Sequence, residues 1–135
     1  MDMKEINRKV VEQFRAGGEV DGMHRERLLL LTTTGARTGA PRTTPMMFHR
    51  YADRLLVMAS NNGAPTAPDW YRNLVANPDV TVEIGDERYS AVAKPLSGEE
   101  LADAWADITA ANPFFLDHEK QAGRTIPVVA LDRLA

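Results

Sequence analysis

Residues 28–51 have the sequence LLLLTTTGARTGAPRTTPMMFHRY, in which two β-rich runs flank a turn rich in glycine. The four leucines and three threonines of residues 28–34 favour a strand. Gly35 and Gly39 interrupt it, and a second strand is expected over residues 43–51. Strands joined by so short a turn pair antiparallel, which excludes the βαβ unit of a nucleotide-binding fold for this stretch.

The same succession of β-rich runs and turns continues along the rest of the chain. Further strands are expected over residues 54–60, 80–84, 87–95 and 126–131, and helices over residues 1–18, 69–76, 97–111 and 114–121. About six antiparallel strands with flanking helices make an α+β fold that is mainly β. A small closed or partly closed barrel is expected, because closure leaves the fewest unpaired strand edges.

The composition is typical of one globular domain. With 135 residues, 44% of them hydrophobic and 26% charged, a single domain over residues 1–135 is expected, with an N-terminal helix (1–18) and a barrel core with inserted helices (27–132). The chain has no cysteine, which excludes disulfides and thiol catalysis. No stretch of the sequence approaches the roughly 18 consecutive apolar residues of a membrane span, and the first residues lack the apolar core of a signal peptide. A cytoplasmic location is therefore expected.

Charge is distributed unevenly along the chain. The net charge is −3, yet no Asp or Glu occurs between residues 26 and 53. The charged residues inside this window, which give it a charge of +4, are Arg27, Arg37, Arg42 and Arg50. The remaining residues include 12 basic and 19 acidic ones, a charge of −7. A local positive patch concentrates anionic ligands. Because few aromatics are interleaved with the arginines, we expect a small anionic molecule and not a nucleic acid.

The first candidate site is the stretch of residues 32–45, TTTGARTGAPRTTP, whose turn occupies residues 35–40 (the hairpin tip). Its glycines allow a ligand to approach the backbone closely, and its N–H groups could form an anion-binding nest. Arg37 and Arg42 carry planar guanidinium groups suited to phosphate or carboxylate. The Gly-Lys-Ser/Thr ending of a P-loop is absent. The alternative is a solvated hairpin with exposed arginines.

The sequence ASNNGAP at residues 59–65 is the second candidate site. Small side chains leave space for a flat ring, backbone amides can hydrogen-bond to it, and Trp70 can form a wall. The alternative is an Asn-Gly turn beside a core tryptophan. His24, His49 and His118 lack the spacing of metal ligands, so no metal site is expected. Since no nucleophile or acid–base pair stands out, an enzyme with this sequence would depend on a bound cofactor.

Three strings, TTTGARTGAPRTTP, ASNNGAPTAPDWYRNLVANPDVTVEIG and IPVVAL, resemble the deazaflavin-dependent nitroreductase family, whose members use coenzyme F420. The resemblance extends from about residue 28 to residue 131 and implies a split β-barrel of the kind that also binds FMN. It implies that Arg37, Thr38 and Gly39 meet the acidic tail of the coenzyme. The phosphate and ribityl chain would lie against Arg42, Thr43, Thr44, Pro45 and Met46.

The resemblance also implies where the ring and the substrate lie. Ala59, Ser60 and Asn61 would line the deazaflavin ring, Trp70 would close the pocket, and Ser60 is the candidate proton donor or orienting group. The substrate side would include Trp70, Asn112, Phe115 and His118. Residues 111–118 contain no tyrosine, whereas tyrosines border the substrate in the family member that activates nitroimidazoles. Nitroimidazole reduction is therefore not implied.

The function implied is hydride transfer from the reduced deazaflavin to a small electron-poor acceptor, namely a quinone, an activated alkene or a nitro compound. Two alternatives remain, an FMN-dependent reductase on the same barrel and a non-catalytic cofactor-binding protein. A monomer or a homodimer is expected. The basic residues of the first helix allow peripheral membrane contact, although packing of its apolar face against the core is the preferred interpretation.

Overall fold

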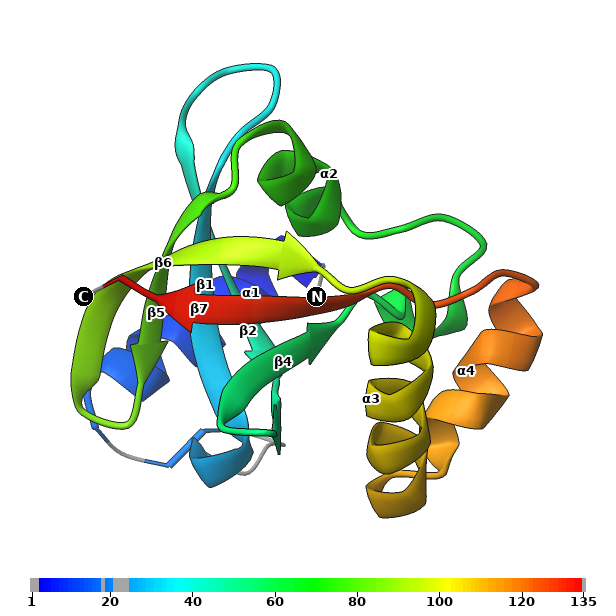
Figure 1. Cartoon of the computed structure of the whole chain (residues 1–135). Helices are drawn as coiled ribbons and strands as arrows, with labels where there is room; N and C mark the ends of the chain where they lie inside the picture. Colours follow the sequence, from blue (N-terminus) through cyan, green and yellow to red (C-terminus); the bar gives the residue numbers. More distant parts are fainter. Residues whose placement is uncertain (1–2, 18, 21–24, 135) are drawn as a thin grey trace.

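A computed structural model describes residues 3–17, 19–20 and 25–134. The helices are α1 (Met3–Arg15), α2 (Asp69–Ala76), α3 (Gly98–Ala111) and α4 (Phe114–Ala122), with short 3-10 turns η1 (Arg25–Arg27) and η2 (Asn61–Gly63). The strands are β1 (Leu28–Thr34), β2 (Pro41–Met47), β3 (His49–Tyr51), β4 (Arg54–Met58), β5 (Asp79–Ile84), β6 (Glu87–Pro95) and β7 (Val128–Arg133). The strands form one curled sheet with the helices around it (Figure 1).

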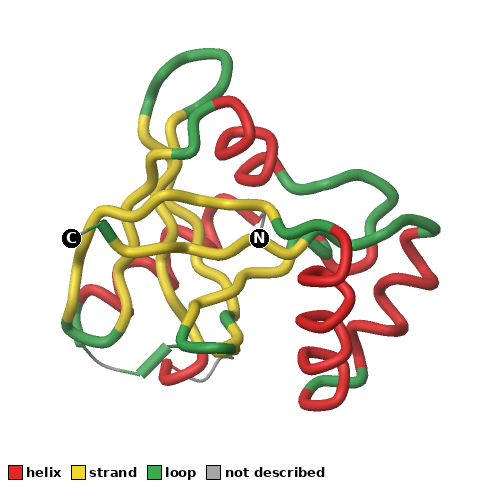
Figure 2. Tube along the Cα trace, viewed as in Figure 1, coloured by secondary structure: helices red, strands yellow, loops and turns green. Residues whose placement is uncertain are grey.

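The sheet has the strand order β2-β1-β5-β6-β7-β4-β3, and every neighbouring pair is antiparallel. Its two edge strands, β2 and β3, follow each other in the chain, separated only by Phe48. The two edges of the curled sheet, whose strands are the yellow parts of the tube in Figure 2, therefore meet where the chain passes from β2 to β3. The expected α+β split-barrel fold is confirmed, with α3 and α4 packed together on one side of it.

The expected single strand over residues 43–51 is wrong, because it is divided into β2 and β3. The Phe48 N–H donates to the Arg27 carbonyl at 3.3 Å, just past the last β1–β2 pair, Leu28 with Met47. The chain then leaves β1 and pairs with β4. The described residues accordingly contain seven strands and not about six. The expected strand over residues 54–60 ends at Met58, and the first helix ends at Arg15; residues 1, 2 and 18 lie outside the described part.

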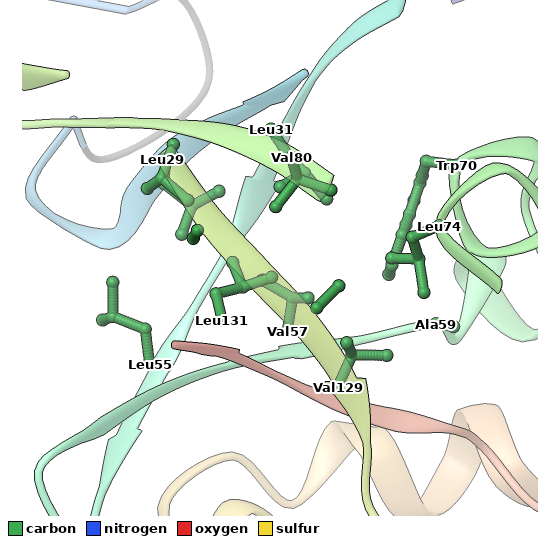
Figure 3. Packing of buried hydrophobic residues seen from close by; sticks show 13 residues of the cluster. Leu29, Leu31, Leu55, Val57, Ala59, Trp70, Leu74, Val80, Val129 and Leu131 are labelled. Atoms are coloured by element: carbon green, nitrogen blue, oxygen red, sulfur yellow. The ribbon is translucent and has the colours of Figure 1, made fainter. Parts of the chain in front are cut away.

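The main core fills the concave side of the curled sheet (Figure 3). Successive side chains of a strand point to opposite faces, so Leu29 and Leu31 of β1 enter this core. Leu28 and Leu30 point the other way and pack against Phe14 of α1. All four leucines of β1 are at most 2% exposed, which explains why this strand is continuously apolar and not alternating.

A second cluster fixes α3 and α4 beside β4. Leu56 and Met58 alternate with the inward-facing residues of β4 and pack against Ile108 of α3 and Phe115 of α4. Because β4 leads directly into the candidate loop at residues 59–65, this packing places α4 beside that loop.

An ionic cluster between β4 and β7 gives the fold a pH-dependent contact. Arg54 donates from Nε to Asp132 Oδ1 at 3.1 Å and from Nη2 to Oδ2 at 3.0 Å, and Lys94 Nζ lies 3.3 Å from Oδ2. Arg54 also binds Glu100 of α3. The hydrogen bonds from Arg54 hold the pKa of Asp132 below its ordinary value of 3.8, against the opposing effect of burial.

We predict that Asp132→Asn lowers the free energy of unfolding at neutral pH by about 1 kcal/mol, a modest value because solvent screens a partly exposed pair. A carboxyl group whose pKa is depressed on folding stabilises the protein above its unfolded pKa, and this contribution is lost as pH falls through the folded value. The difference between wild type and variant should therefore be constant above about pH 5 and shrink under more acidic conditions. Urea unfolding across this range measures it, and a difference that persists undiminished in acid would contradict the assignment.

Candidate active site

A cavity of about 660 Å³ opens between β2, the chain after β4, the start of α2 and α4. Its lining combines small polar residues with sulfur-containing and aromatic ones. The residues that line it are Asn7, Thr44, Pro45, Met46, Met47, Met58, Ser60, Asn61, Thr66, Ala67, Pro68, Asp69, Trp70, Arg72, Phe114, Phe115 and His118. These come from segments far apart in the sequence, which the curl of the sheet brings together.

Strand β2 forms one wall of this cavity. Arg42, Thr44 and Met46 lie opposite Thr33, Leu31 and Leu29 of β1, so all three share the inner face of the sheet. Thr44, Met46 and the intervening Pro45 line the cavity, whereas Arg42 stands further along the same row, exposed, toward the hairpin tip. Thr43 faces the other side, where its hydroxyl lies 2.7 Å from that of Thr32. The structure thus separates Thr43 from its neighbours in the expected site.

The hairpin tip is held firmly by hydrogen bonds. Gly35 N–H donates to the Ala40 carbonyl at 2.8 Å, Gly39 N–H to the Gly35 carbonyl at 2.9 Å, and Ala40 N–H to Thr38 Oγ1 at 3.2 Å. Ala36 N–H donates to Asn73 Oδ1 of α2 at 3.0 Å. These four amides are engaged within the chain and do not contribute to the anion-binding nest considered for the tip.

Positive charge at the tip is the feature that remains available to a ligand. Arg37 and Arg42 are both exposed, and within the described residues neither has a hydrogen-bond or ion-pair partner. The tip rises beside α2 in Figure 1. Asn73 of α2 fixes it there, because its Nδ2 also donates to Thr33 Oγ1 at 3.3 Å. Two unpaired guanidinium groups therefore lie near the tip, Arg37 in the turn and Arg42 at the adjoining end of β2.

The chain after β4 (residues 59–68, the pocket loop) forms the second wall. Ser60 is only 7% exposed, and Ser60 and Asn61 both line the cavity. Ala59 is fully buried and does not line it. Asn61 has a positive φ of 50°, and its Nδ2 donates to the Thr66 carbonyl at 3.1 Å. Further along, Thr66, Ala67 and Pro68 continue the wall.

Trp70 belongs to both the core and the cavity. Its side chain packs in the main core beside Leu74, as Figure 3 shows, and it is 9% exposed. It also lines the cavity, and its ring meets Tyr71 edge to face with a centroid distance of 6.5 Å. Trp70 is therefore both a core residue and part of the cavity wall, so the two interpretations of the sequence are compatible.

Helix α4 supplies the third wall through Phe114, Phe115 and His118. The His118 ring lies edge-on to both phenylalanines, at centroid distances of 5.4 and 5.8 Å. Its Nδ1 is buried and has no hydrogen-bond partner among the described residues. Asn112 does not line the cavity: it ends α3, where its N–H donates to the Ile108 carbonyl at 2.8 Å.

Several lining residues were missed by sequence reasoning. Met47 and Met58 are indistinguishable from core residues in the sequence, and Asn7 lies on a helix that the pattern assigned to packing. Arg72 falls inside a string that carried the family resemblance, but only the fold brings it to the cavity, where it pairs with Asp69 and donates to the Ala67 carbonyl.

Two further observations concern the described part of the chain alone. It contains no group of three or more His, Asp or Glu side chains arranged to hold a metal ion, and His24 lies outside it. None of its helices has the length and apolar character that a membrane span requires.

Comparison with known proteins places this geometry in a family. The sequence profile of the F420H2-dependent quinone reductase family matches residues 5–133. An F420H2-dependent quinone reductase of Mycobacterium tuberculosis is 41% identical over 108 residues, which cover 78% of this chain and 72% of that protein. A solved F420-H2-dependent reductase shares 34% identity with a TM-score of 0.72, over 82% of this chain and 100% of the other.

Two other solved structures extend the comparison. One, described as a domain-swapped dimer, has 34% identity and a TM-score of 0.74, and covers 93% of this chain and 96% of its own. A heme storage protein from Vibrio cholerae, with 18% identity and a TM-score of 0.58 over 93% of this chain and 88% of its own, shares the fold alone. The profile match and the relatives together establish that the chain is an oxidoreductase whose cofactor is coenzyme F420, and that it belongs to the F420H2-dependent quinone reductase family.

Proposed function

We propose that this protein reduces a quinone with reduced coenzyme F420, in the cavity between β2, the pocket loop and α4. The observation that carries the proposal is that Thr44 and Met46, which line the cavity, share one face of β2 with the unpaired Arg42. A volume of about 660 Å³ lies within the range of cofactor and ligand pockets. Quinone is preferred over an activated alkene or a nitro compound because the family profile and the relatives are named for quinone reduction.

The residues present fit the coenzyme in a specific orientation. Arg37, Thr38 and Gly39 would hold the carboxylates of the tail, and Arg42 with Thr44 the phosphate. Pro45 and Met46 would follow the ribityl chain into the cavity. Thr43, whose hydroxyl pairs with Thr32, would contribute only backbone. The matching observation is that, among the described residues, the unpaired Arg37 and Arg42 lie outside the cavity lining, whereas the one lining arginine, Arg72, is paired with Asp69.

The ring would lie against the pocket loop, with Trp70 as its end wall. Ser60 and Asn61 line the cavity there, and buried Ala59 supports them from behind. When bound, the reduced deazaflavin supplies a hydride to the quinone, which also takes up one proton to become the quinol. The protein binds and orients the two molecules and excludes water from between them.

The acceptor would occupy the α4 side of the cavity, where Phe114 and Phe115 offer flat apolar surfaces. A buried polar atom without a partner is costly, and His118 Nδ1 is such an atom. We propose that His118 gains its hydrogen-bond partner from the acceptor and that Ser60 Oγ is the second group able to orient or pass the proton. Asn112 does not line the cavity and is not part of this proposal.

A homodimer is the assembly that we propose, because a relative of 34% identity is described as a domain-swapped dimer.

We predict that protein loaded with reduced coenzyme F420 reduces menadione faster than cyclohexenone or a nitroimidazole, and that FMN does not replace the coenzyme. The coenzyme's absorbance at its oxidised maximum follows turnover. His118→Phe should raise the KM for quinone roughly tenfold, the effect of losing one or two good hydrogen bonds, and leave coenzyme affinity unchanged.

Three outcomes would contradict this proposal. Preferred reduction of the enone or the nitro compound would overturn the quinone assignment. Equal activity with FMN would favour the flavin alternative, and tight coenzyme binding without turnover of any acceptor would identify a cofactor-binding protein.

A further inference from the structure

Arg124 connects the end of α4 to the pocket loop through four main-chain contacts. It lies between α4 and β7, and its side chain is half-buried. Its Nη2 donates to the carbonyls of Ala59 at 3.1 Å, Ser60 at 3.3 Å and Thr66 at 3.1 Å, and its Nε donates to that of Ala64 at 3.3 Å. One guanidinium group therefore donates hydrogen bonds to carbonyls at both ends of the loop.

We propose that Arg124 is a positioning residue, which fixes the pocket loop so that two consecutive backbone N–H groups, those of Ser60 and Asn61, are presented to the deazaflavin ring. This inference rests on the proposed function, since it assumes that the ring lies against Ser60 and Asn61. Arg124 itself does not line the cavity, so it acts through the loop and not by contact.

The direction of these N–H groups follows from peptide geometry. All peptide bonds here are trans, and in a trans peptide the C=O and the following N–H point in opposite directions. The Ala59 and Ser60 carbonyls point toward Arg124, so the N–H groups of Ser60 and Asn61 point away from it. Within the described residues neither N–H has an acceptor. They remain available for the carbonyl oxygen or ring nitrogen of a bound ligand.

The local backbone conformation agrees with this direction. Ser60 is in the right-handed region, with φ −75° and ψ −28°, and Asn61 follows with a positive φ of 50°. Successive right-handed and left-handed residues turn their N–H groups toward one point and make a site for negative charge. Negative charge that the reduced ring carries before it gives up the hydride would be stabilised there.

Arg124 adds to the hydrogen bonds inside the loop, among them those from Gly63 N–H to the Ser60 carbonyl and from Asn61 Nδ2 to the Thr66 carbonyl. A positive φ at a residue other than glycine is unfavourable, and the turn η2 has no side-chain cap. Converging carbonyl dipoles repel each other unless a positive charge lies between them. Arg124 provides that charge with charge-assisted hydrogen bonds, and Gly63 packs so closely on Gln121 of α4 that an added Cβ would lie 2.9 Å from Gln121 Oε1. The loop and the end of α4 thus form one unit.

The test compares Arg124→Ala and Arg124→Lys with Arg54→Ala, a control variant that loses an arginine with three hydrogen bonds that does not line the cavity. We expect Arg124→Ala to weaken coenzyme F420 binding about 10- to 100-fold, the usual penalty for misplaced ligand-contacting groups. Arg124→Lys should recover little of the lost affinity, because an ammonium group cannot bridge carbonyls at both ends of the loop as the planar guanidinium does. Added methylguanidinium should restore affinity to Arg124→Ala alone.

A second readout needs no coenzyme. Hydrogen exchange of the free protein should accelerate over residues 59–68 in Arg124→Ala and stay unchanged over β1, whereas Arg54→Ala should leave the loop unchanged. Wild-type affinity in Arg124→Ala and Arg124→Lys, or equal losses in Arg124→Ala and Arg54→Ala, would overturn the inference. Failure of the wild-type protein to bind the coenzyme would instead overturn the proposed function.

Discussion

Replacing Arg37 and Arg42 together by alanine is expected to weaken coenzyme F420 binding about 100-fold, because each lost charge-assisted contact is worth roughly a factor of ten. Both guanidinium groups lack partners among the described residues, so the substitutions break no internal ion pair and should leave the melting temperature unchanged. Exposed charges are screened by salt, with a Debye length of about 10 Å at 0.1 M. The loss should therefore shrink as ionic strength rises, which titration by coenzyme fluorescence at two salt concentrations measures.

The stretch between residues 26 and 53, which contains no Asp or Glu, also provides the matched control. Arg27 and Arg50 belong to the same run of residues and carry the same charge. They lie at the other end of the β1–β2 hairpin, since β1 starts directly after Arg27 and Arg50 is on β3. If the location of the charge matters, Arg27→Ala with Arg50→Ala should weaken binding little. Equal losses in the two double variants would show a general electrostatic effect and contradict specific contacts at the tip.

Trp70→Ala is expected to produce the largest loss of stability. The side chain is 9% exposed and packs in the main core, and removal of such a large buried side chain costs about 3–5 kcal/mol. Domains of this kind are stable by only about 5–15 kcal/mol, so the melting temperature should fall by roughly 10–20 °C. Because Trp70 also lines the cavity, coenzyme affinity should fall below that of the wild type even at temperatures where the variant remains folded.

Leu74→Ala separates the two roles of this tryptophan. Leu74 lies on the same helix and in the same core cluster, is 1% exposed, and does not line the cavity. Leu74→Ala should lower the free energy of unfolding by about 2–5 kcal/mol. At temperatures where this variant remains folded, its affinity for the coenzyme should equal that of the wild type. Thermal unfolding and coenzyme titration of both variants make the comparison. Affinity losses of the same size in both would mean that Trp70 acts only through the core.

Local patterns predicted the strands but not where they change partners. The expected ranges 28–34 and 87–95 coincide with β1 and β6, because a β-rich run between turn residues contains what is needed to define them. The β-rich run that ends at Tyr51 is continuous in sequence. Its division at Phe48 arises because the chain leaves β1 and joins β4, a choice set by the curl of the whole sheet.

The candidate site divides in the same way. The hairpin tip and the pocket loop were found from glycines, arginines and small residues that lie together in sequence. The contacts that hold them were not, because they join distant residues: Asn73 to the amide of Ala36, and Arg124 to the carbonyls of Ala59 and Thr66. A single asparagine or arginine carries no local signal of a partner on another element. Of the four tip amides engaged within the chain, three bond inside the hairpin and only that of Ala36 is taken by α2.

The central claim is that the hairpin tip binds the charged tail while the cavity binds the ring. The most direct test is a parallel titration with coenzyme F420 and with its tail-free deazaflavin riboside, which keeps the ring and ribityl chain but lacks the phosphate and glutamates. Wild-type protein should prefer the complete coenzyme about 100-fold, and the Arg37→Ala, Arg42→Ala variant should bind both with similar affinity. A preference that survives loss of both arginines would contradict the account.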